Sequence, residues 1–335
     1  MSKARQLADL GNVYDDGALS NRNRIINGDM RIDQRNGGAA VTPTADGTYT
    51  LDRWKTSLTQ SSKFSVQQQT SVAPDGFTYA LKVTSLSAYS VGAGDTFSIY
   101  QVLEGFNVAD LSWGTATAKT VTLSFRVYSS LTGTFGGAIV APSFGFSYPF
   151  TYSVSSANTW TTVSVTIAGP TSGTFGTTNG NGFSVFFGLG SGATYSGTAG
   201  AWASSSALTA TGAVNVVGTS GATFYITGVQ LEVGDTATPF EHRSYGQELA
   251  LCQRYYIDLN TGNYYGLLPT SGDSYRHWVQ VLPVTMRASP SVTGVGGNGV
   301  ISNSAGTATT LNINSNLGNS TSSMYFTSFK LDAEL

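Results

Sequence analysis

The chain has 335 residues, with hydrophobic residues at 40% and charged residues at only 11%, and its formal net charge is -2. So little charge, with no basic block, excludes a phosphate-tracking surface, and we expect no nucleic acid partner. The single cysteine excludes an intrachain disulfide, and the absence of a signal-like or membrane-length apolar run predicts no secretory export and no membrane insertion.

Residues 1–23 are expected to form a separate leader. Ala4, Leu7 and Ala8 recur at helical spacing, and Gly11 ends the pattern. Three helical turns are not stable alone in water. Two interpretations stay open: a frayed terminus, or a segment for attachment and oligomerisation that sister chains or a docking partner order.

Short strands dominate residues 24–242. Apolar and polar residues alternate in seven segments, and turn clusters such as "APDG" and "TNGNG" separate them. The segments are "KFSVQQQ", "YALKVTSL", "TFSIYQVL", "TVTLSFRVYSS", "WTTVSVTIAG", "GFSVFFGLG" and "ATFYITGVQLEV". Because no helical pattern interrupts them, we predict a jelly-roll sandwich over this range.

Residues 243–335 are predicted to hold a linking helix and a second, smaller β domain. Ser244 and Gln247 have the spacing of a capping box, so a short helix is expected to begin there. Its apolar stripe is Tyr245, Leu249, Cys252 and Tyr256. Beyond the helix, "PSVTGV", "TTLNIN" and "MYFTSFKLDAEL" resume strand patterning. The predicted fold class is therefore all-β: a jelly-roll sandwich, a short helix and a smaller C-terminal β domain.

Sequence motifs favour no enzyme class. The "GVGGNG" stretch at 294–299 matches a dinucleotide-binding pattern, but a strand pattern follows it where a helix is required. His242 and His277 lack neighbours of metal-ligand type, and Cys252 lies on the apolar stripe as a packing residue. We therefore expect a non-enzymatic protein with no catalytic residue, no metal and no cofactor.

Carboxylates leave one enzymatic alternative open. Cleavage of a glycoside needs only two facing carboxyl groups, which can come from distant parts of the chain. The available residues are Asp29, Asp33, Asp52, Glu104, Asp110, Glu232 and Glu241.

Aromatic residues are the stronger functional candidates, because exposed rings stack on the apolar faces of sugars. Trp54 and Trp160 lie beside strand patterns and are expected in the core. A Gly/Ser-rich segment and the "YRHW" cluster supply the predicted glycan-binding residues, which are Trp202, Tyr195, Tyr275 and Trp278. The alternative is that these rings fill the edge of the sandwich or a seam between chains.

Several segments resemble bacteriophage tail-fibre and related virion structural proteins. They are "NRIINGDMRIDQRNGG", "YTLDRW", "FSIYQVLEG", "AKTVTLSFRVYSS", "TFYITGVQLEVGDTATPFEHRSYGQELALCQRYY" and "VLPVTMRASPSVT". The resemblance implies a jelly roll similar to carbohydrate-binding modules, with "INGDM" matching their first strand, followed by a small β domain. It also places Asp29 near a segment that sometimes holds structural calcium, although this chain shows no ligand set for that ion.

The function that the resemblance implies is that of a virion protein assembled in the host cytoplasm. It would be a tail fibre that binds host-surface polysaccharide during adsorption, in contact with other tail or adaptor proteins. Such fibres are commonly homotrimers, and the predicted subunit interface is Tyr245, Leu249, Cys252, Tyr256 and the C-terminal domain. The alternatives are a glycan-cleaving tail depolymerase and a purely structural head or tail decoration protein.

Overall fold

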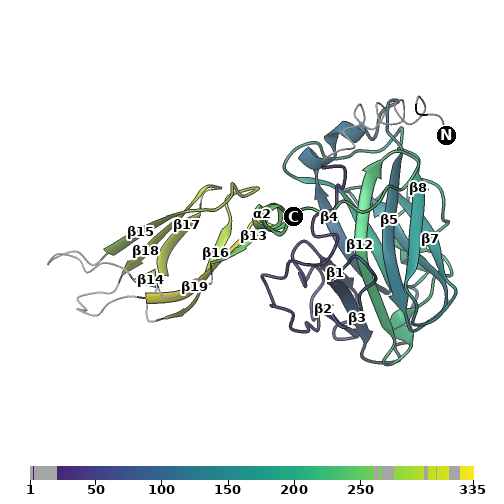
Figure 1. Ribbon diagram of the computed structural model, residues 1–335, viewed down its shortest axis with the longest axis horizontal. Coiled ribbons are helices and arrows are strands. Elements are labelled where there is room, and N and C mark those ends of the chain that lie inside the picture. Colours follow the sequence, from purple (N-terminus) through teal and green to yellow (C-terminus); the bar gives the residue numbers. More distant parts are fainter. Residues whose placement is uncertain are drawn as a thin grey trace. The chain divides into compact units, whose positions relative to one another are not determined.

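The computed structural model describes the backbone of residue 3 and of 21–259, 264–265, 275–297, 301–306, 308–316 and 325–335. Side chains are described for residues 3, 21–259, 281–293, 308–310 and 329–335. The expected leader helix falls on residues outside this part. The chain divides into two compact units, Met1–Arg243 and Ser244–Leu335 (Figure 1).

Two antiparallel sheets of five strands build the larger unit, which confirms the predicted sandwich. One, the β12 sheet, has the order β2 (Phe64–Gln69), β3 (Ala80–Ser85), β12 (Thr223–Val233), β5 (Val121–Ser129), β8 (Thr161–Ile167). The other, the β9 sheet, has the order β1 (Lys55–Leu58), β4 (Thr96–Glu104), β9 (Asn181–Ser191), β6 (Gly133–Val140), β7 (Ser147–Val154). Shorter elements are η1 (Gly105–Asn107), η2 (Ala109–Leu111), η3 (Ala193–Tyr195), β10 (Ser196–Gly197), β11 (Thr209–Ala210) and η4 (Val216–Gly218).

The core of this unit lies between the inner faces of the two sheets. Phe125 of β5 and Phe187 of β9 are both buried, and their ring centroids are 5.0 Å apart. Phe224 of β12 stacks on Phe135 of β6 at 6.0 Å. Trp54 is fully buried, as expected. Large rings from both sheets therefore meet in the core of the sandwich.

All seven predicted segments form strands, but the prediction omitted β1, β6 and β7 of the two main sheets and the short β10 and β11. In β6, "GTFGGAIV", six consecutive residues are buried, so no alternation marks the strand. β7 contains Pro149, which argues against a strand in the middle of a sheet. The strand lies at the edge of the β9 sheet, and the backbone of Pro149 faces away from β6, where its oxygen accepts from Gly200 N–H at 2.9 Å, so the missing N–H costs no hydrogen bond to β6.

The expectation that "INGDM" begins the sandwich as a strand is wrong. Asn27 and Met30 have φ of 58° and 60°, and this left-handed conformation interrupts extended backbone. The buried Asn27 amide donates to the carbonyl oxygens of Ile32 and Asp52 at 2.8 and 3.0 Å. One asparagine side chain thus satisfies backbone groups that a sheet would otherwise pair.

The helix of the second unit, α2 (Tyr245–Gln253), begins as predicted. The Ser244 hydroxyl accepts a hydrogen bond from the Gln247 amide at 3.3 Å, and the Gln247 side chain accepts from the Ser244 amide at 3.0 Å. The capping box is therefore confirmed. The predicted continuation of the helix to Tyr256 is wrong, because this residue pairs with Asp332 in a sheet.

The described elements that follow α2 in the second unit are all strands, as the sequence predicted. They are β13 (Tyr256–Asp258), β14 (Tyr264–Tyr265), β15 (Tyr275–Val281), β16 (Ser291–Gly297), β17 (Ile301–Gly306), β18 (Thr310–Asn316) and β19 (Tyr325–Asp332). β19 pairs with β13, β14 and β16, while β18 lies between β15 and β17. Among the described side chains, a small core includes Ile257, Phe329 and Leu331. In the described part of the chain, no helix combines the length and apolar character needed to cross a bilayer.

Candidate functional site: an aromatic pocket in the sandwich

Two loops meet where β4 ends and β9 begins. One contains η1 and η2 and continues to residue 119, and the other covers residues 168–180. Backbone hydrogen bonds join them: Gly105 N–H donates to Gly180 O at 2.9 Å, and Phe106 N–H to Thr178 O at 2.8 Å. Because the contacts are made by backbone, the spacing of the two loops is set by the fold and not by flexible side chains.

Glycines allow this close approach. A Cβ added to Gly105 would lie 2.6 Å from the Thr178 oxygen and 2.7 Å from the Gly176 carbonyl carbon. At Gly182, a Cβ would lie 2.6 Å from a methyl group of Val108. Any larger residue would push the loops apart, so these positions need glycine.

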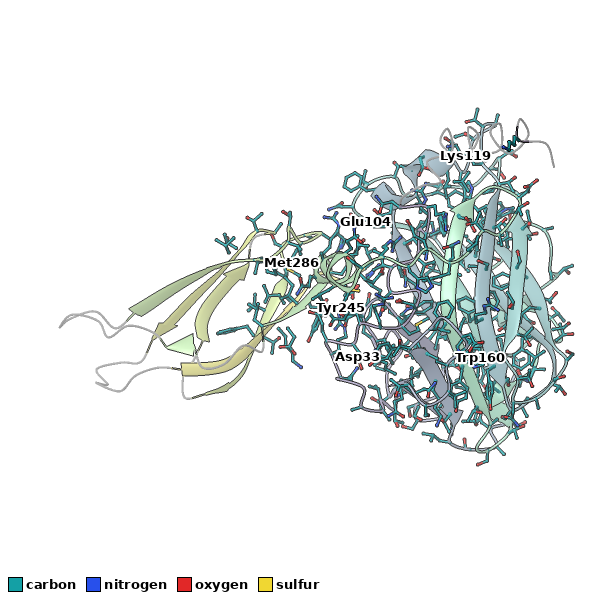
Figure 2. All side chains as sticks on the ribbon, viewed as in Figure 1. Asp33, Glu104, Lys119, Trp160, Tyr245 and Met286 are labelled. Carbon is teal, nitrogen blue, oxygen red and sulfur yellow. The ribbon has the colours of Figure 1, made fainter. Side chains whose placement is uncertain are left out.

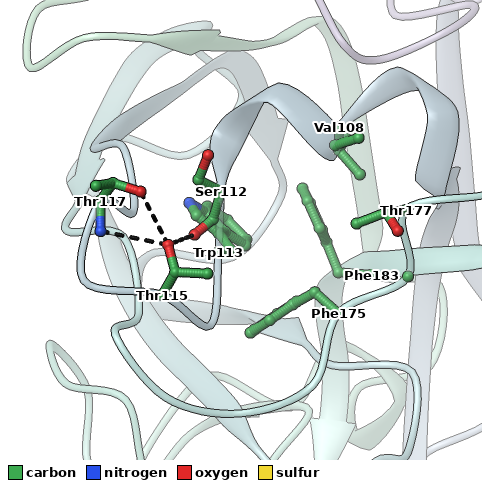
Figure 3. A pocket seen from close by; sticks show the side chains of 10 residues that line it. Val108, Ser112, Trp113, Thr115, Thr117, Phe175, Thr177 and Phe183 are labelled. Atoms are coloured by element: carbon green, nitrogen blue, oxygen red, sulfur yellow. Dashed lines mark hydrogen bonds between the residues drawn. The ribbon is translucent and has the colours of Figure 1, made fainter.

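The loops enclose a pocket of about 360 Å³ (Figure 3). This volume is near the lower end of the range for small-molecule sites, roughly 300–1,000 Å³. Its lining residues are Val108, Ala109, Ser112, Trp113, Thr115, Thr117, Phe175, Gly176, Thr177 and Phe183. Aromatic rings and hydroxyl groups dominate this set.

Three aromatic rings form the apolar wall: Phe183 and Trp113 are 1% and 7% exposed and form its base, and the half-buried Phe175 offers the most accessible ring surface. Trp113 stacks on Phe183, with ring centroids 4.5 Å apart and planes inclined by 26°. Phe175 meets Trp113 edge to face at 5.4 Å. The Trp113 indole N–H donates to the carbonyl oxygen of Lys119 at 2.9 Å, which fixes the orientation of the ring. The wall is therefore rigid before any ligand arrives.

Hydroxyl groups form the polar side, as Figure 3 shows. The Thr115 hydroxyl donates to the Ser112 carbonyl oxygen at 2.7 Å and lies 3.0 Å from the Thr117 hydroxyl. Ser112 has a φ of 53° and closes the turn after η2. The Thr115 hydroxyl has no capacity left, because it also accepts from the Thr117 backbone N–H at 3.3 Å and from the Thr117 hydroxyl. The Thr117 hydroxyl keeps its acceptor lone pairs, and Ser112 and Thr177 add further hydroxyl groups, so the loop can bind a polyhydroxylated ligand.

No lining residue carries an ionisable side chain. The pocket therefore offers stacking surface and neutral hydrogen-bonding groups, but no general acid, general base or nucleophile of the activated type. Within the described residues, no cluster of three or more His, Cys, Asp or Glu side chains is placed to hold a metal ion. Its chemistry is that of binding an uncharged polar molecule with an apolar face.

Six of the seven carboxylates that could have formed a glycosidase pair hold structural contacts, and the seventh, Glu104, is buried at the end of β4. The contacts are Asp29 with Arg31, Asp110 with Arg24, Glu232 with Arg22 and Thr238, Glu241 with Arg243, Asp52 with Gln34, and Asp33 with the backbone of Asn36 and Gly38. Burial raises the pKa of Asp33, against the opposing effect of these backbone donors. None of the seven residues lines the pocket.

Trp202, predicted to bind glycan, lies behind the pocket wall. Its ring stacks on Phe146 at 5.2 Å and meets Trp113 and Phe175 edge to face at 5.5 and 5.7 Å. Its indole N–H donates to the Ala168 oxygen at 2.8 Å. The structure thus brings Trp202 to the pocket as support for two lining rings, and direct contact with a glycan stays a prediction.

The other predicted residues lie elsewhere. Tyr195 ends η3 and is half-buried, with no ring contact to Trp202 among the described side chains. Tyr275 and Trp278 lie on β15 in the second unit, and their side chains are outside the described residues. Of the predicted subunit interface, Tyr245 is exposed, Leu249 is half-buried, and Cys252 and Tyr256 are buried within the chain.

The sequence analysis did not identify Trp113, Phe175 or the threonines as site residues. The signal was present, because "SWGTAT" and "TFGTTNGNG" are Gly/Thr-rich segments with an embedded aromatic residue. The same pattern led to Trp202. What the pattern could not show is that these two segments, about 60 residues apart, form one wall.

No family model matches the chain, and no curated protein matches its sequence. Among solved structures, the chain is similar to the enzymatically active domain of tailspike protein 4 from bacteriophage CBA120, at 12% identity over 63% of this chain, 21% of that chain and a TM-score of 0.34. The chain therefore spans about a fifth of the length of that tailspike.

Two further solved structures cover nearly the same share of this chain. A putative sugar binding protein from Bacteroides thetaiotaomicron is 12% identical, with 63% of this chain and 100% of that chain covered and a TM-score of 0.38. A family 11 carbohydrate-binding module from Clostridium thermocellum is 12% identical, with 62% and 99% covered and a TM-score of 0.30.

Proposed function

We propose that the chain is a glycan-binding protein and that the aromatic pocket holds a neutral sugar unit. The observation that carries this proposal is a preformed cavity with an aromatic wall, a row of hydroxyl groups and no ionisable lining residue. A pyranose presents C–H groups on its faces and hydroxyl groups around its edge. The two halves of the pocket match these two kinds of surface.

Rigidity supports this assignment. The Trp113 ring is held by Phe183 and by its hydrogen bond to Lys119, and the loops are joined by backbone bonds. A ligand would therefore bind without first paying to order the wall. The glycine positions serve the same end, because they hold the pocket open at a fixed width.

The test uses a glycan array followed by calorimetry with the best neutral oligosaccharide. Phe175→Ala removes one lining ring, and we expect affinity to fall about tenfold or more, the loss of one stacking contact of roughly 1.4 kcal/mol. Phe106→Ala is the matched control: this ring is 60% exposed and does not line the pocket. The affinity of the Phe106→Ala variant for the neutral oligosaccharide should equal that of the unchanged protein.

A second variant guards against misfolding of the first. Thr177 is an exposed lining residue, so Thr177→Trp should fold normally while its indole fills the cavity. Neutral glycan binding should then be abolished. Binding that survives both Phe175→Ala and Thr177→Trp, or the absence of any neutral ligand on the array, contradicts the proposal.

In a wider setting, we propose a non-enzymatic tail fibre of a phage particle, assembled in the host cytoplasm as a homotrimer. The support is the residue pattern from "INGDM" to "CQRYY" and the sparse charge of the chain. The fibre would bind host-surface polysaccharide during adsorption and attach through other tail proteins. Light scattering on the purified chain should give three times the subunit mass, and a stable monomer at micromolar concentration would exclude the trimer.

A further inference from the structure

The outward face of the β12 sheet carries a row of aromatic residues. In the strand register, Tyr225 of β12 faces Lys82 on one side and Tyr128 of β5 on the other. Trp160 comes next, because the following residue, Thr161 of β8, pairs with Val127. Since these residues alternate with core positions such as Phe224 and Val127, the row lies on the outer side of the sheet. Tyr225 itself is only 7% exposed, so the accessible surface of the row comes from the half-buried Lys82, Tyr128 and Trp160.

The expectation that Trp160 belongs to the core is therefore wrong. The tryptophan has the same parity as Thr162 and Ser164, which are exposed, and its own side chain is half-buried. Figure 2 places Trp160 over the sheet that contains β12 and β5. The alternating pattern was correct, but it could not show which of its two faces points inward.

The rings of the row touch one another. Tyr128 lies 5.0 Å from Tyr225 and 5.6 Å from Trp160 between ring centroids, and the Lys82 ammonium is 5.8 Å from the Tyr225 ring. Four neighbouring strands at a spacing of about 4.8 Å give the row a length of roughly 14 Å. This is a surface for several linked sugars and not for a single one.

The charge on this face is of one sign. Lys82 and Arg126 have no ion pair among the described residues, although Arg126 donates to the hydroxyl of Thr162. The strands β2, β3, β5 and β8 contain no Asp or Glu, and β12 contains none before Glu232. An anion at this row would therefore meet two cations and no carboxylate on the neighbouring strands.

We propose that this face, the Tyr225–Trp160 row with Lys82 and Arg126, is a second ligand site that binds an acidic polysaccharide lying across the strands. The rings stack on sugar faces, and the two cations meet carboxylate, sulfate or phosphate groups of the polymer. Surrounding hydroxyl groups, such as those of Thr162 and Ser164, offer further hydrogen bonds. This site is separate from the pocket and takes a ligand of different charge.

Nucleic acid fits this face poorly. Binding its backbone takes many Lys or Arg side chains along one path, while this row has two and the whole chain has a net charge of -2. A polysaccharide needs fewer cations, because its rings stack on the aromatic groups and only some of its units carry charge.

The test pairs acidic polymers with neutralised forms of the same polymers. An array presents uronate, sulfated and phosphorylated polysaccharides beside their methyl-esterified, desulfated or dephosphorylated counterparts. The full chain is applied at about 0.01 M and about 0.5 M salt, between which the screening length falls from about 30 Å to about 4 Å. We expect retention on at least one acidic polymer, about tenfold weaker retention on its neutral form, and weaker retention at high salt.

Variants separate this site from the pocket. Lys82→Gln with Arg126→Gln should reduce acidic polymer binding about tenfold and remove its salt dependence, and Trp160→Ala should reduce it by a similar factor. Phe175→Ala should leave acidic binding unchanged, just as the Lys82 and Arg126 changes should leave neutral binding in the pocket unchanged.

Three outcomes would overturn the inference. The first is no acidic polymer retained, and the second is equal retention of acidic and neutral forms. The third is a change in the mass of the assembly with Trp160→Ala in light scattering, which would assign the row to contacts between copies of the chain. Because the pocket variants have their own readout, failure here leaves the proposed function of the pocket intact.

Discussion

The pocket and the aromatic row are both built around tryptophan and hydroxyl groups, yet they differ in what holds them. At the pocket, backbone hydrogen bonds and glycines set the distance between two loops, as the Gly105–Gly180 bond shows. On the row, side chains such as Tyr128 stand on a sheet whose backbone is already fully paired. Changes at the glycines of the first region therefore act on the fold, while changes of exposed side chains in the second leave the backbone pairing in place.

The difference also separates the kind of ligand. The pocket has no ionisable lining residue, whereas the row carries two cations. Under the two proposals above, the pocket would take one neutral unit of a polymer and the row several units of an acidic polymer. The two regions can be altered independently, because no residue belongs to both.

The largest expected difference between the two regions comes from adding a single methyl group at Gly105. Gly105→Ala places a Cβ 2.6 Å from the Thr178 oxygen, and we expect the free energy of unfolding to fall by about 2 kcal/mol or more, since backbone must move. Gly180→Ala, in the facing loop, has no atom within 4 Å of the new Cβ and should change stability by less than about 0.5 kcal/mol. Guanidinium unfolding measures both, and equal losses would show that the loops are not closely packed.

A second prediction contrasts tyrosines of the interior and the outer face. The Tyr152 hydroxyl is buried and has no hydrogen-bond partner in the described part of the chain. Tyr152→Phe should therefore raise the free energy of unfolding by about 1 kcal/mol near pH 7, because an unsatisfied buried hydroxyl is removed without loss of shape. Tyr128→Phe, on the half-exposed row, should change stability by less than about 0.5 kcal/mol.

The same pair predicts a pH dependence. Burial raises the pKa of Tyr152 well above its ordinary value of about 10. The unfolded chain therefore loses this proton first, and the stability held by the neutral phenol is present below pH 10 and is lost as the pH rises above it. Tyr152→Phe should lose less stability than the unchanged protein between pH 10 and 11.5 in denaturant unfolding. A parallel loss would show that this phenol reaches solvent.

The smallest effect compares two threonine hydroxyl groups. Thr115→Ala removes the hydrogen bond to the Ser112 carbonyl oxygen and should lower the free energy of unfolding by about 1 kcal/mol, because it loosens the turn beside Trp113. Thr162→Ala removes an exposed hydroxyl on the outer face, where water replaces it for Arg126, and should cost less than about 0.5 kcal/mol. Thermal unfolding resolves the two, and a larger loss at Thr162 would reverse the proposed contrast.

Much of the fold could be predicted because its local signals are strong. Alternation with a period of two marked seven strands of the sandwich, and Ser244 with Gln247 marked the start of α2 to the residue. The prediction failed where local signals were silent or misleading. Glycine-rich β6 is buried along most of its length, and Pro149 hides an edge strand.

The candidate site shows the same limit more sharply. Trp160 was assigned to the core, while the structure places it on an outer face. Trp202 was predicted to bind glycan, which stays a prediction, and its ring packs against Phe146. Both have strongly aromatic or Gly/Ser-rich neighbours in the sequence. Their environments differ because the strand face that carries Trp160 points outward and because the loop that carries Trp202 packs against Phe146. Neither outcome can be read from the neighbouring residues in the sequence.

By itself, the sequence determined that this chain forms short strands with one buried side each, that a capped helix follows them, and that few charges are available. The strands, the capped helix and the sparse charge follow from residue type and from spacing over a few positions. Only the tertiary structure decided which face of each strand is inner, and that the loops holding Trp113 and Phe175 close around one pocket. The physical reason is that strand pairing and loop contact join residues tens of positions apart, at distances that periodicity does not encode.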